Sequence, residues 1–329
     1  MKKNILVVLF VLFCCVAVFS AASAQKAVGD YKIALILPGS INDQSWNATN
    51  YAGLVASNEQ LGTNIEYVEN IQAADYESTF RQYAERGYDL VLAAGTQFDE
   101  AANAVAAEYP DTTFCVVNGT VSTGDNVAPI FPREYEGSYI AALIAGQVSE
   151  KGQFATIGGF PNQAMENLLS VYEKVSVDIA KERGIEDAAA VRAYANSWDD
   201  IALGKQMTEQ MIDNGADVIF IYANQVGLGG IQAAAEKGAK FIGFSSDQTV
   251  IDPETVVASV DFDFKAFYTW AVDKFLKGEL SGNMVHEAGI AEGLFVPIYT
   301  ENVSEEIQTF VAEKLAEYED GKVDLITLF

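Results

Sequence analysis

The chain has 329 residues, a formal charge of −26, three cysteines and a single histidine, His286. A charge this negative repels nucleic-acid backbones and anionic membrane surfaces, so we expect neither as a partner. One histidine cannot supply a histidine–cysteine zinc site and argues against a Ser-His-Asp or Cys-His catalytic centre. We therefore expect no metal, no cofactor and no catalytic residue.

The first residues have the pattern of an export signal. Lys2 and Lys3 precede an apolar run that extends from Ile5 to Phe19 and ends in Ala22-Ser23-Ala24. Because the run is shorter than the roughly 20 residues that span a bilayer, we predict a signal peptide, residues 1–24, cleaved after Ala24. Cleavage removes two lysines and no acid, which shifts the formal charge from −26 to −28.

A lipoprotein signal would place a small residue just before the modified cysteine. Cys14 follows Phe13 and Cys15 follows Cys14, so the pattern favours simple cleavage over lipidation. We expect an exported protein, periplasmic or associated with the cell surface. Its one remaining cysteine, Cys115, lies in a predicted strand and is expected to pack as a small hydrophobic residue.

Short apolar runs alternate with helical patterns along the mature chain. The predicted strands are Ile33–Leu37, Leu90–Ala94, Phe114–Val117, Phe154–Gly158, Ala190–Tyr194, Val218–Tyr222, Phe241–Phe244 and Val256–Val260. Continuous apolar runs are typical of parallel strands covered on both faces. Helical spacing fills the intervals, as between Asp199 and Asn214, where Gly215 follows in the C-cap position. This alternation predicts doubly wound α/β lobes.

One segment occurs twice, 128 residues apart. Its repeated residues are Gly87, Asp89, Gln97, Ala106, Ala107 and Glu108, which recur as Gly215, Asp217, Gln225, Ala234, Ala235 and Glu236. The period is too long for a solenoid and indicates two related lobes. Two such lobes facing each other enclose a cleft, where ligands are expected to bind.

The lobes are expected to be joined by three crossings. Prolines and polar turns occur at Pro129–Pro132, at Val260-Asp261 and near Ala291–Gly293. We predict an N-terminal lobe of residues 31–131 plus 263–290 and a C-terminal lobe of residues 132–262 plus 291–329. Three crossings would form a hinge between the lobes.

Polar and aromatic residues gather in the loops that follow the predicted strands. In α/β sheets the carboxyl ends of the strands form the ligand side. The candidate ligand residues in these loops are Asn42, Asp43, Trp46, Phe98, Asp99, Trp198, Gln225, Asp247 and Asp261. The three aromatic residues could stack on a flat ligand, and the carboxylates could accept from its amine or ring N–H groups.

Each of these residue types has a structural alternative. Core packing is the alternative for the aromatic residues, and helix N-capping is the alternative for Asp43 and Asp99. Asp199 and Asp200 are predicted to cap a helix. Gly227-Leu228-Gly229-Gly230 is predicted to be a tight turn, since no P-loop lysine follows it. We expect the carboxylates of Asp261 and Asp263 not to converge on a metal.

The sequence resembles the basic membrane protein family, the substrate-binding proteins of ABC transporters that include the purine nucleoside receptors. The resemblance covers nearly all of the mature chain and is carried by Ser40-Ile41-Asn42-Asp43-Gln44-Ser45-Trp46-Asn47, Tyr135-Glu136-Gly137-Ser138-Tyr139, Ile157-Gly158-Gly159, Gly215-Ala216-Asp217-Val218-Ile219 and Gly243-Phe244-Ser245-Ser246-Asp247-Gln248. It implies a type I periplasmic-binding-protein fold, α/β with two doubly wound lobes joined by three crossovers. It also implies a purine ligand, a membrane permease as partner and no enzymatic activity.

The resemblance assigns Trp46 to stacking on the purine and Asn42 and Asp43 to its edge, with Asp99 and Asp247 as further contacts. Nucleoside receptors commonly carry a sugar-binding lysine just after the strand that here ends in Ala258-Ser259-Val260. This chain has Asp261 there. Together with Asn196-Ser197-Trp198, the aspartate is similar to a branch that binds a free base such as adenine. We therefore predict a nucleobase in preference to a nucleoside.

The sequence is also compatible with two other functions. A sugar-binding or sensory protein could have the same fold, because one fold serves many ligands and aromatic rings also stack on pyranoses. An exported nucleoside hydrolase would need convergent carboxylates that hold a metal or an activated water. We predict a monomeric solute-binding protein that hands a purine to a permease.

Overall fold

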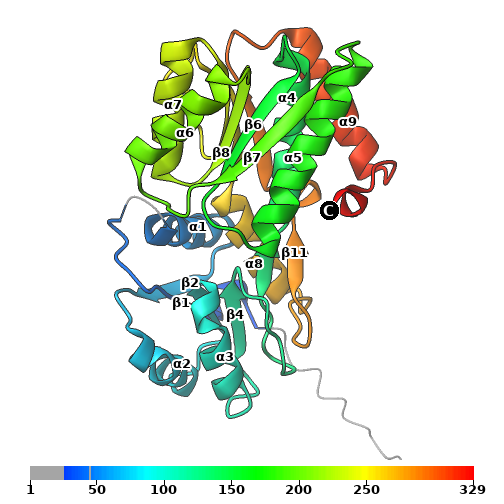
Figure 1. Cartoon of the computed structure of the whole chain (residues 1–329). Helices are drawn as coiled ribbons and strands as arrows, with labels where there is room; N and C mark the ends of the chain where they lie inside the picture. Colours follow the sequence, from blue (N-terminus) through cyan, green and yellow to red (C-terminus); the bar gives the residue numbers. More distant parts are fainter. Residues whose placement is uncertain (1–25, 44–45) are drawn as a thin grey trace, which may run out of the picture.

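The computed structural model describes residues 26–43 and 46–329. They form two α/β lobes, drawn one above the other in Figure 1, each with a six-stranded sheet. The predicted signal peptide lies outside the described residues. The chain passes from the lower lobe to the upper one, returns for one helix and one strand, and ends in the upper lobe (Figure 1).

The lower lobe contains a fully parallel sheet with the strand order β11-β5-β4-β3-β1-β2. Its elements are β1 (Lys32–Ile36), α1 (Trp46–Leu61), β2 (Asn64–Val68), α2 (Tyr76–Glu85), β3 (Leu90–Ala94), α3 (Asp99–Ala106), β4 (Thr113–Val117), β5 (Ile130–Pro132), α8 (Phe264–Leu276) and β11 (His286–Ala288). Short 3₁₀ helices span Val28–Asp30, Ala73–Asp75 and Thr96–Phe98.

The upper lobe contains a sheet with the order β12-β10-β9-β8-β6-β7, in which only β12 runs antiparallel to its neighbour. Its elements are α4 (Glu134–Val148), β6 (Gln153–Gly158), α5 (Gln163–Glu182), β7 (Ala189–Tyr194), α6 (Ile201–Asp213), β8 (Val218–Tyr222), α7 (Gln225–Lys237), β9 (Lys240–Ser245), β10 (Val256–Phe262), β12 (Phe295–Tyr299) and α9 (Glu305–Glu319). Short 3₁₀ helices span Ile290–Glu292 and Leu325–Leu328.

The internal repeat of the sequence corresponds to a repeat in the topology. Strands β1 to β5 of the first sheet occupy the same relative places as β6 to β10 of the second. Asp89 and Asp217, which are equivalent in the sequence repeat, each bind the start of a neighbouring strand. The carboxylate of Asp89 accepts from the backbone N–H of Lys32 at the start of β1, and that of Asp217 accepts from Gln153 at the start of β6.

Alternating side chains divide each sheet between two cores. In β1, Ile33 and Leu35 face the helices α1 and α8, whereas Ala34 and Ile36 face α2 and α3. The first of these cores continues through α4 and α5 into the upper lobe, so a single apolar cluster extends through both lobes. A third core lies between the second sheet and the helices α6 and α7.

The three connections between the lobes all join carboxyl edges of the two sheets. The first leaves β5 at Pro132 and enters α4, and the second leaves β10 at Phe262 and enters α8. The third leaves β11 at Ala288 and enters antiparallel β12, whose first residue, Phe295, pairs with Phe262. Because each link is short, the carboxyl edges of the two sheets face each other.

The type I periplasmic-binding-protein fold with three crossovers is therefore confirmed. Two local expectations need correction. The segment Ile130–Pro132, predicted to be a crossing, is strand β5, and the crossing begins at Arg133. The run Gly227–Gly230 is not a turn but lies inside α7, where Gly229 would place a Cβ 2.0 Å from the carbonyl oxygen of Ile201. These glycines let α6 and α7 approach closely.

Candidate ligand-binding site

Trp46 begins α1 and lies over the carboxyl end of β3. Its indole Nε1 donates to the carbonyl oxygen of Ala94, the last residue of β3, at 3.1 Å. Its ring meets Phe264 edge to face, with centroids 5.8 Å apart and an interplanar angle of 89°. The side chain is half-buried. The contacts with Ala94 and Phe264 hold the ring in place, and the rest of its surface is accessible to a ligand.

Asn42 and Asp43 lie beside Trp46 on the loop after β1, and both are exposed. The carboxylate of Asp43 accepts from the backbone N–H groups of Asn47 and Ala48, each at 3.0 Å, and from Nδ2 of Asn47 at 2.7 Å. Asp43 therefore binds the first turn of α1, which was the structural alternative predicted for it. This anchoring also fixes the turn that carries Trp46.

Phe98 and Asp99 are neighbours in the sequence but differ in their surroundings. Phe98 is fully buried and packs against Tyr76 and Phe80 in the core beneath α2 and α3. Asp99 is the first residue of α3 and is nine-tenths buried. Its Oδ2 accepts from the backbone N–H of Thr120 at 3.0 Å, whereas its Oδ1 has no hydrogen-bond partner.

In the upper lobe, Trp198 follows β7 and rests on the loop after β6. A Cβ on Gly159 would stand 2.3 Å from Cζ3 of the indole, so only glycine leaves room for the ring. Phe160, next to this glycine, lies 5.6 Å from the Trp198 ring and is exposed. The backbone N–H of Gln225 donates to the carbonyl oxygen of Trp198 at 2.9 Å, which places this candidate at the same edge.

Three carboxylates gather at the carboxyl ends of β9 and β10. Asp247 accepts from the N–H of Thr249 at 3.0 Å. Asp261 is half-buried, and burial raises its pKa, with smaller contributions from the negative charges of Asp263 and Asp247. Asp263 directly follows β10, whose last residue is Phe262. Asp263 also caps α8 by accepting from Lys265 and Ala266.

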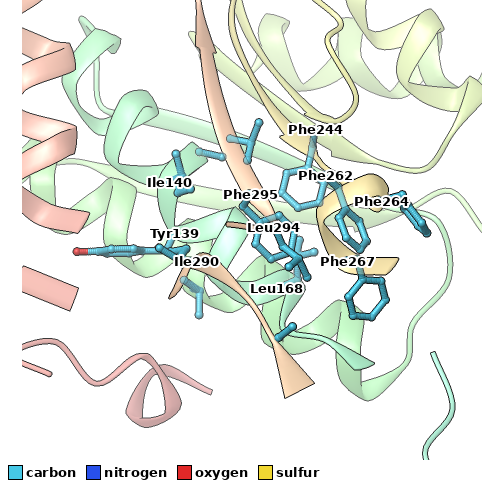
Figure 2. Packing of buried hydrophobic residues seen from close by; sticks show 14 of the residues in the cluster. Tyr139, Ile140, Leu168, Phe244, Phe262, Phe264, Phe267, Ile290, Leu294 and Phe295 are labelled. Atoms are coloured by element: carbon cyan, nitrogen blue, oxygen red, sulfur yellow. The ribbon is translucent and has the colours of Figure 1, made fainter. Parts of the chain in front are cut away.

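A chain of aromatic rings links the two lobes behind these residues. Figure 2 shows its central part, where Phe244, Phe295, Phe262 and Phe264 follow one another across the junction. At one end, Phe244 meets Tyr222 at 5.0 Å, and at the other, Phe264 meets Trp46. Trp46 of the lower lobe and Tyr222 of the upper lobe are therefore the two ends of one continuous row of aromatic rings.

Glu134 and Tyr222 belong to the same region and were not predicted. Glu134 is the first residue of α4, directly after the first crossing, and Tyr222 is the last residue of β8. The Tyr222 hydroxyl donates to Glu134 Oε1 at 2.6 Å. Burial raises the pKa of Glu134 to about 7, although the hydrogen bond from Tyr222 works in the opposite direction.

A buried ion-pair network holds the first and third crossings together. Glu136 is completely buried, pairs with Arg133 and accepts from the backbone N–H of Ile290 at 2.6 Å. Arg133 also binds Glu292 at 3.0 Å. Gly289 completes the network, because a Cβ there would fall 2.0 Å from Glu136 Oε2. This network lies beside the site and defines the hinge.

Other parts of the molecule are distinct from this site. A cavity of about 390 Å³, lined by Tyr31, Asp89, Asp111, Thr113 and residues 275–278, lies at the opposite, amino edge of the first sheet. Within residues 26–43 and 46–329, no cluster of three metal-binding side chains is found and no helix is long and apolar enough to cross a membrane. Cys115 is buried in β4, as predicted.

Comparison with known proteins identifies the family. The model of a family described as "ABC transporter substrate-binding protein PnrA-like" matches residues 31–319. The chain belongs to this family. The resemblance that the sequence motifs indicated is thereby confirmed, and with it the assignment to the substrate-binding proteins of ABC transporters, which are exported proteins.

Two curated relatives and one solved structure illustrate the match. The ABC transporter nucleoside-binding protein BmpA of Lactococcus lactis is 25% identical over 98% of this chain and 99% of its own length. A purine-binding protein of Brucella abortus is 25% identical over 95% of this chain and 87% of its own length. The structure of a solute-binding protein of an ABC transporter system from Aeropyrum pernix has a TM-score of 0.70 at 21% identity. The match covers 89% of this chain and 92% of that one, and it supports the assignment of the fold.

Proposed function

We propose that this PnrA-like protein binds a purine between the carboxyl edges of its two lobes and delivers it to the permease of an ABC importer. The observation that carries the proposal is the placement of Trp46 and Trp198. Each is a half-buried tryptophan at the carboxyl edge of one sheet, and the three crossings bring these edges face to face. Two indole rings suit the two flat faces of one planar ligand.

The polar groups of the site restrict the ligand further. Asp99, Asp247 and Asp261 place carboxyl groups at these edges, and carboxylates repel phosphate and other anions. A neutral heterocycle with ring N–H and amino donors is the better partner, because hydrogen bonds to charged acceptors are about twice as strong as neutral ones. Ring stacking adds about 0.5–1.5 kcal/mol for each aromatic pair.

The names of two relatives support a purine. One is called nucleoside-binding and the other purine-binding. We favour a free nucleobase for this chain because Asp261 stands where nucleoside receptors of the family carry a sugar-binding lysine. Asn42, Asp43 and Gln225 remain candidate contacts, whereas the ring of Phe98 is buried in the core against Tyr76 and Phe80.

Transport follows from closure of the lobes about the hinge. A ligand held by both edges favours the closed arrangement, which presents both lobe surfaces together to a permease. We further propose that the protein acts as a monomer after cleavage at Ala24, in the periplasm or at the cell surface. No bond is made or broken in this function.

The test uses the three tryptophans of the chain. Adenine is titrated by calorimetry into the wild-type protein and the Trp46→Ala, Trp198→Ala and Trp270→Ala variants. Trp270 packs on Phe267 in α8 and serves as the control. Loss of Trp46 or Trp198 should weaken binding tenfold or more, at 1.4 kcal/mol per decade, whereas loss of Trp270 should not. Unchanged affinity in both site variants, binding of ribose alone, or product formation from inosine would contradict the proposal.

A further inference from the structure

The carboxyl group of Glu134 lies at the centre of the upper carboxyl edge. Its partner Tyr222 ends β8, which is flanked by β6 and β9. The backbone of Tyr222 pairs with Gly158, and its carbonyl oxygen accepts from the N–H of Gly159 at 3.1 Å. Gly159 in turn supports the ring of Trp198. A ligand stacked on Trp198 is therefore close to Glu134.

The hydrogen bonds of the pair leave one oxygen available. Tyr222 is a donor to Oε1, since burial raises its pKa well above the usual range and keeps the phenol protonated. Within the described part of the chain, no donor contacts Oε2 of Glu134. Oε2 is also not among the fully buried side-chain atoms that lack a partner. Oε1 is thus oriented by Tyr222 and keeps a second lone pair for a ligand donor, while Oε2 can meet the ligand directly.

We propose that Glu134 meets the ligand as a neutral carboxylic acid and pairs with an edge on which an amine donor and a ring-nitrogen acceptor stand side by side. This inference rests on the proposed function and deepens it. A neutral carboxyl group offers one O–H donor and one acceptor oxygen, which matches the amino group and adjacent ring nitrogen of adenine. An ionised carboxylate has only acceptors and would face the lone pair of that ring nitrogen.

The surroundings of Glu134 favour the neutral form. Burial in the apolar junction is the larger influence and raises its pKa to about 7, so the acid predominates at pH 6. The titratable groups on its own helix are Tyr135, Glu136 and Tyr139, and Arg133 directly precedes this helix. Titratable and charged groups on the elements around it include Tyr222 of β8, Asp261 of β10, Tyr299 of β12, Lys240 of β9, Glu166, Tyr172 and Glu173 of α5, and Glu317 and Tyr318 of α9.

Most of these groups have other partners. Arg133 is held by Glu136 and Glu292. Glu166 and Glu173 pair with Arg192. Lys240 donates to the carbonyl oxygen of Val148 at the far end of α4. Asp99 and Asp261 are the other site acids whose pKa is raised, and the experiment must therefore separate their titration from that of Glu134.

The experiment is a calorimetric titration of adenine at pH 6.0 and 8.5 into wild type, Glu134→Gln, Asp99→Asn and Asp261→Asn. If only the neutral acid binds, the apparent Kd scales inversely with its population, so wild-type affinity should fall roughly thirtyfold between the two pH values. Glutamine offers a donor and an acceptor at both pH values. Glu134→Gln should bind within a few-fold of wild type at pH 6.0 and keep that affinity at pH 8.5. Asp99→Asn and Asp261→Asn should retain the wild-type pH dependence.

A second readout is proton uptake, obtained at pH 8.0 from titrations in buffers of different ionisation enthalpy. Wild type should take up close to one proton per adenine, and Glu134→Gln none. A wild-type affinity that does not fall with pH, or a Glu134→Gln variant that remains folded but loses binding at pH 6.0, would overturn the inference while leaving purine binding intact. Absence of adenine binding at both pH values would overturn the proposed function as well.

Discussion

The indole of Trp198 lies on the backbone of Gly159, at a place where a single added methyl group has no room. A Cβ at this position would stand 2.3 Å from Cζ3 and 2.5 Å from Cε3 of the ring. The preceding Gly158 likewise leaves room for the ring of Tyr194, because a Cβ on Gly158 would stand 2.8 Å from Cε1 of that ring. The two glycines are therefore needed for the position of the aromatic rings at the upper edge.

Gly159→Ala should consequently displace Trp198 without altering any group that touches the ligand. We expect the affinity for adenine to fall by at least tenfold, because the ring can no longer lie parallel to the ligand at its native depth. Calorimetry provides the affinity, and far-ultraviolet circular dichroism checks the fold. Gly124→Ala is a matched control, since its Cβ would have only ordinary contacts at 3.7 Å. Equal affinities for the two variants would show that Trp198 does not contact the ligand.

The raised pKa of Glu134 also predicts how stability depends on pH. The pKa of Glu134 rises from 4.5 to about 7 on folding. Between these two pH values the native state therefore holds a proton that the unfolded state has released. The stability that this proton contributes is fully present below about pH 4.5 and is lost as the pH rises through about 7. The melting temperature of wild type relative to Glu134→Gln should therefore fall by a few degrees between pH 4.5 and 8. A constant difference across this range would contradict the assignment.

The buried hinge network should contribute strongly to stability. Glu136→Ala leaves Arg133 without its buried partner and removes the acceptor for Ile290, so we expect a loss of about 3–5 kcal/mol. The exposed pair Lys322–Asp320 is the control, and Lys322→Ala should change stability by less than about 1 kcal/mol. Urea unfolding measures both. A loss of similar size in both variants would show that the network is not a structural element of the hinge.

Asp261 offers a test of ligand preference. Replacing it by lysine introduces the residue that the resemblance to nucleoside receptors implies for this position, and places it beside Asp247 and Asp263, whose charges already act there. We expect Asp261→Lys to improve binding of adenosine relative to adenine by about tenfold. Glu301→Lys, on an exposed turn, controls for the change in net charge. If the ratio of the affinities for adenosine and adenine does not change, Asp261 does not determine whether the protein prefers the base or the nucleoside.

The strands could be predicted wherever both sheet faces are covered. Val218–Tyr222 is a continuous apolar run because β8 lies in the middle of its sheet. The edge strand β2 was missed, since Asn64, Glu66 and Tyr67 are partly or fully exposed and break the apolar pattern. Strand β5 was missed because Pro129 precedes it and Pro132 is its last residue, and these prolines suggested a turn. Burial on two sides leaves a strong pattern in the sequence, and burial on one side leaves a weak one.

The site was predictable only in part for a different reason. Trp198 could be found because it follows a strand, but its dependence on Gly159 arises from a contact between two separate loops. Glu134 begins a helix, and its partner Tyr222 lies 88 residues away, so neither residue has a local signature. Phe98 follows a strand just as Trp198 does, yet the 3₁₀ helix Thr96–Phe98 turns its ring into the core. Position after a strand does not fix the direction of a side chain.

Equilibrium binding of purines to the wild-type protein is the most direct test of the central claim. The protein is purified, freed of any bound purine, and titrated by calorimetry with adenine, guanine, hypoxanthine, adenosine, guanosine and ribose at pH 6. We predict tight binding of a free base, weaker binding of its nucleoside and no binding of ribose. Nucleoside binding as tight as that of the base would contradict the nucleobase preference, and no response to any purine would contradict the assignment of the site.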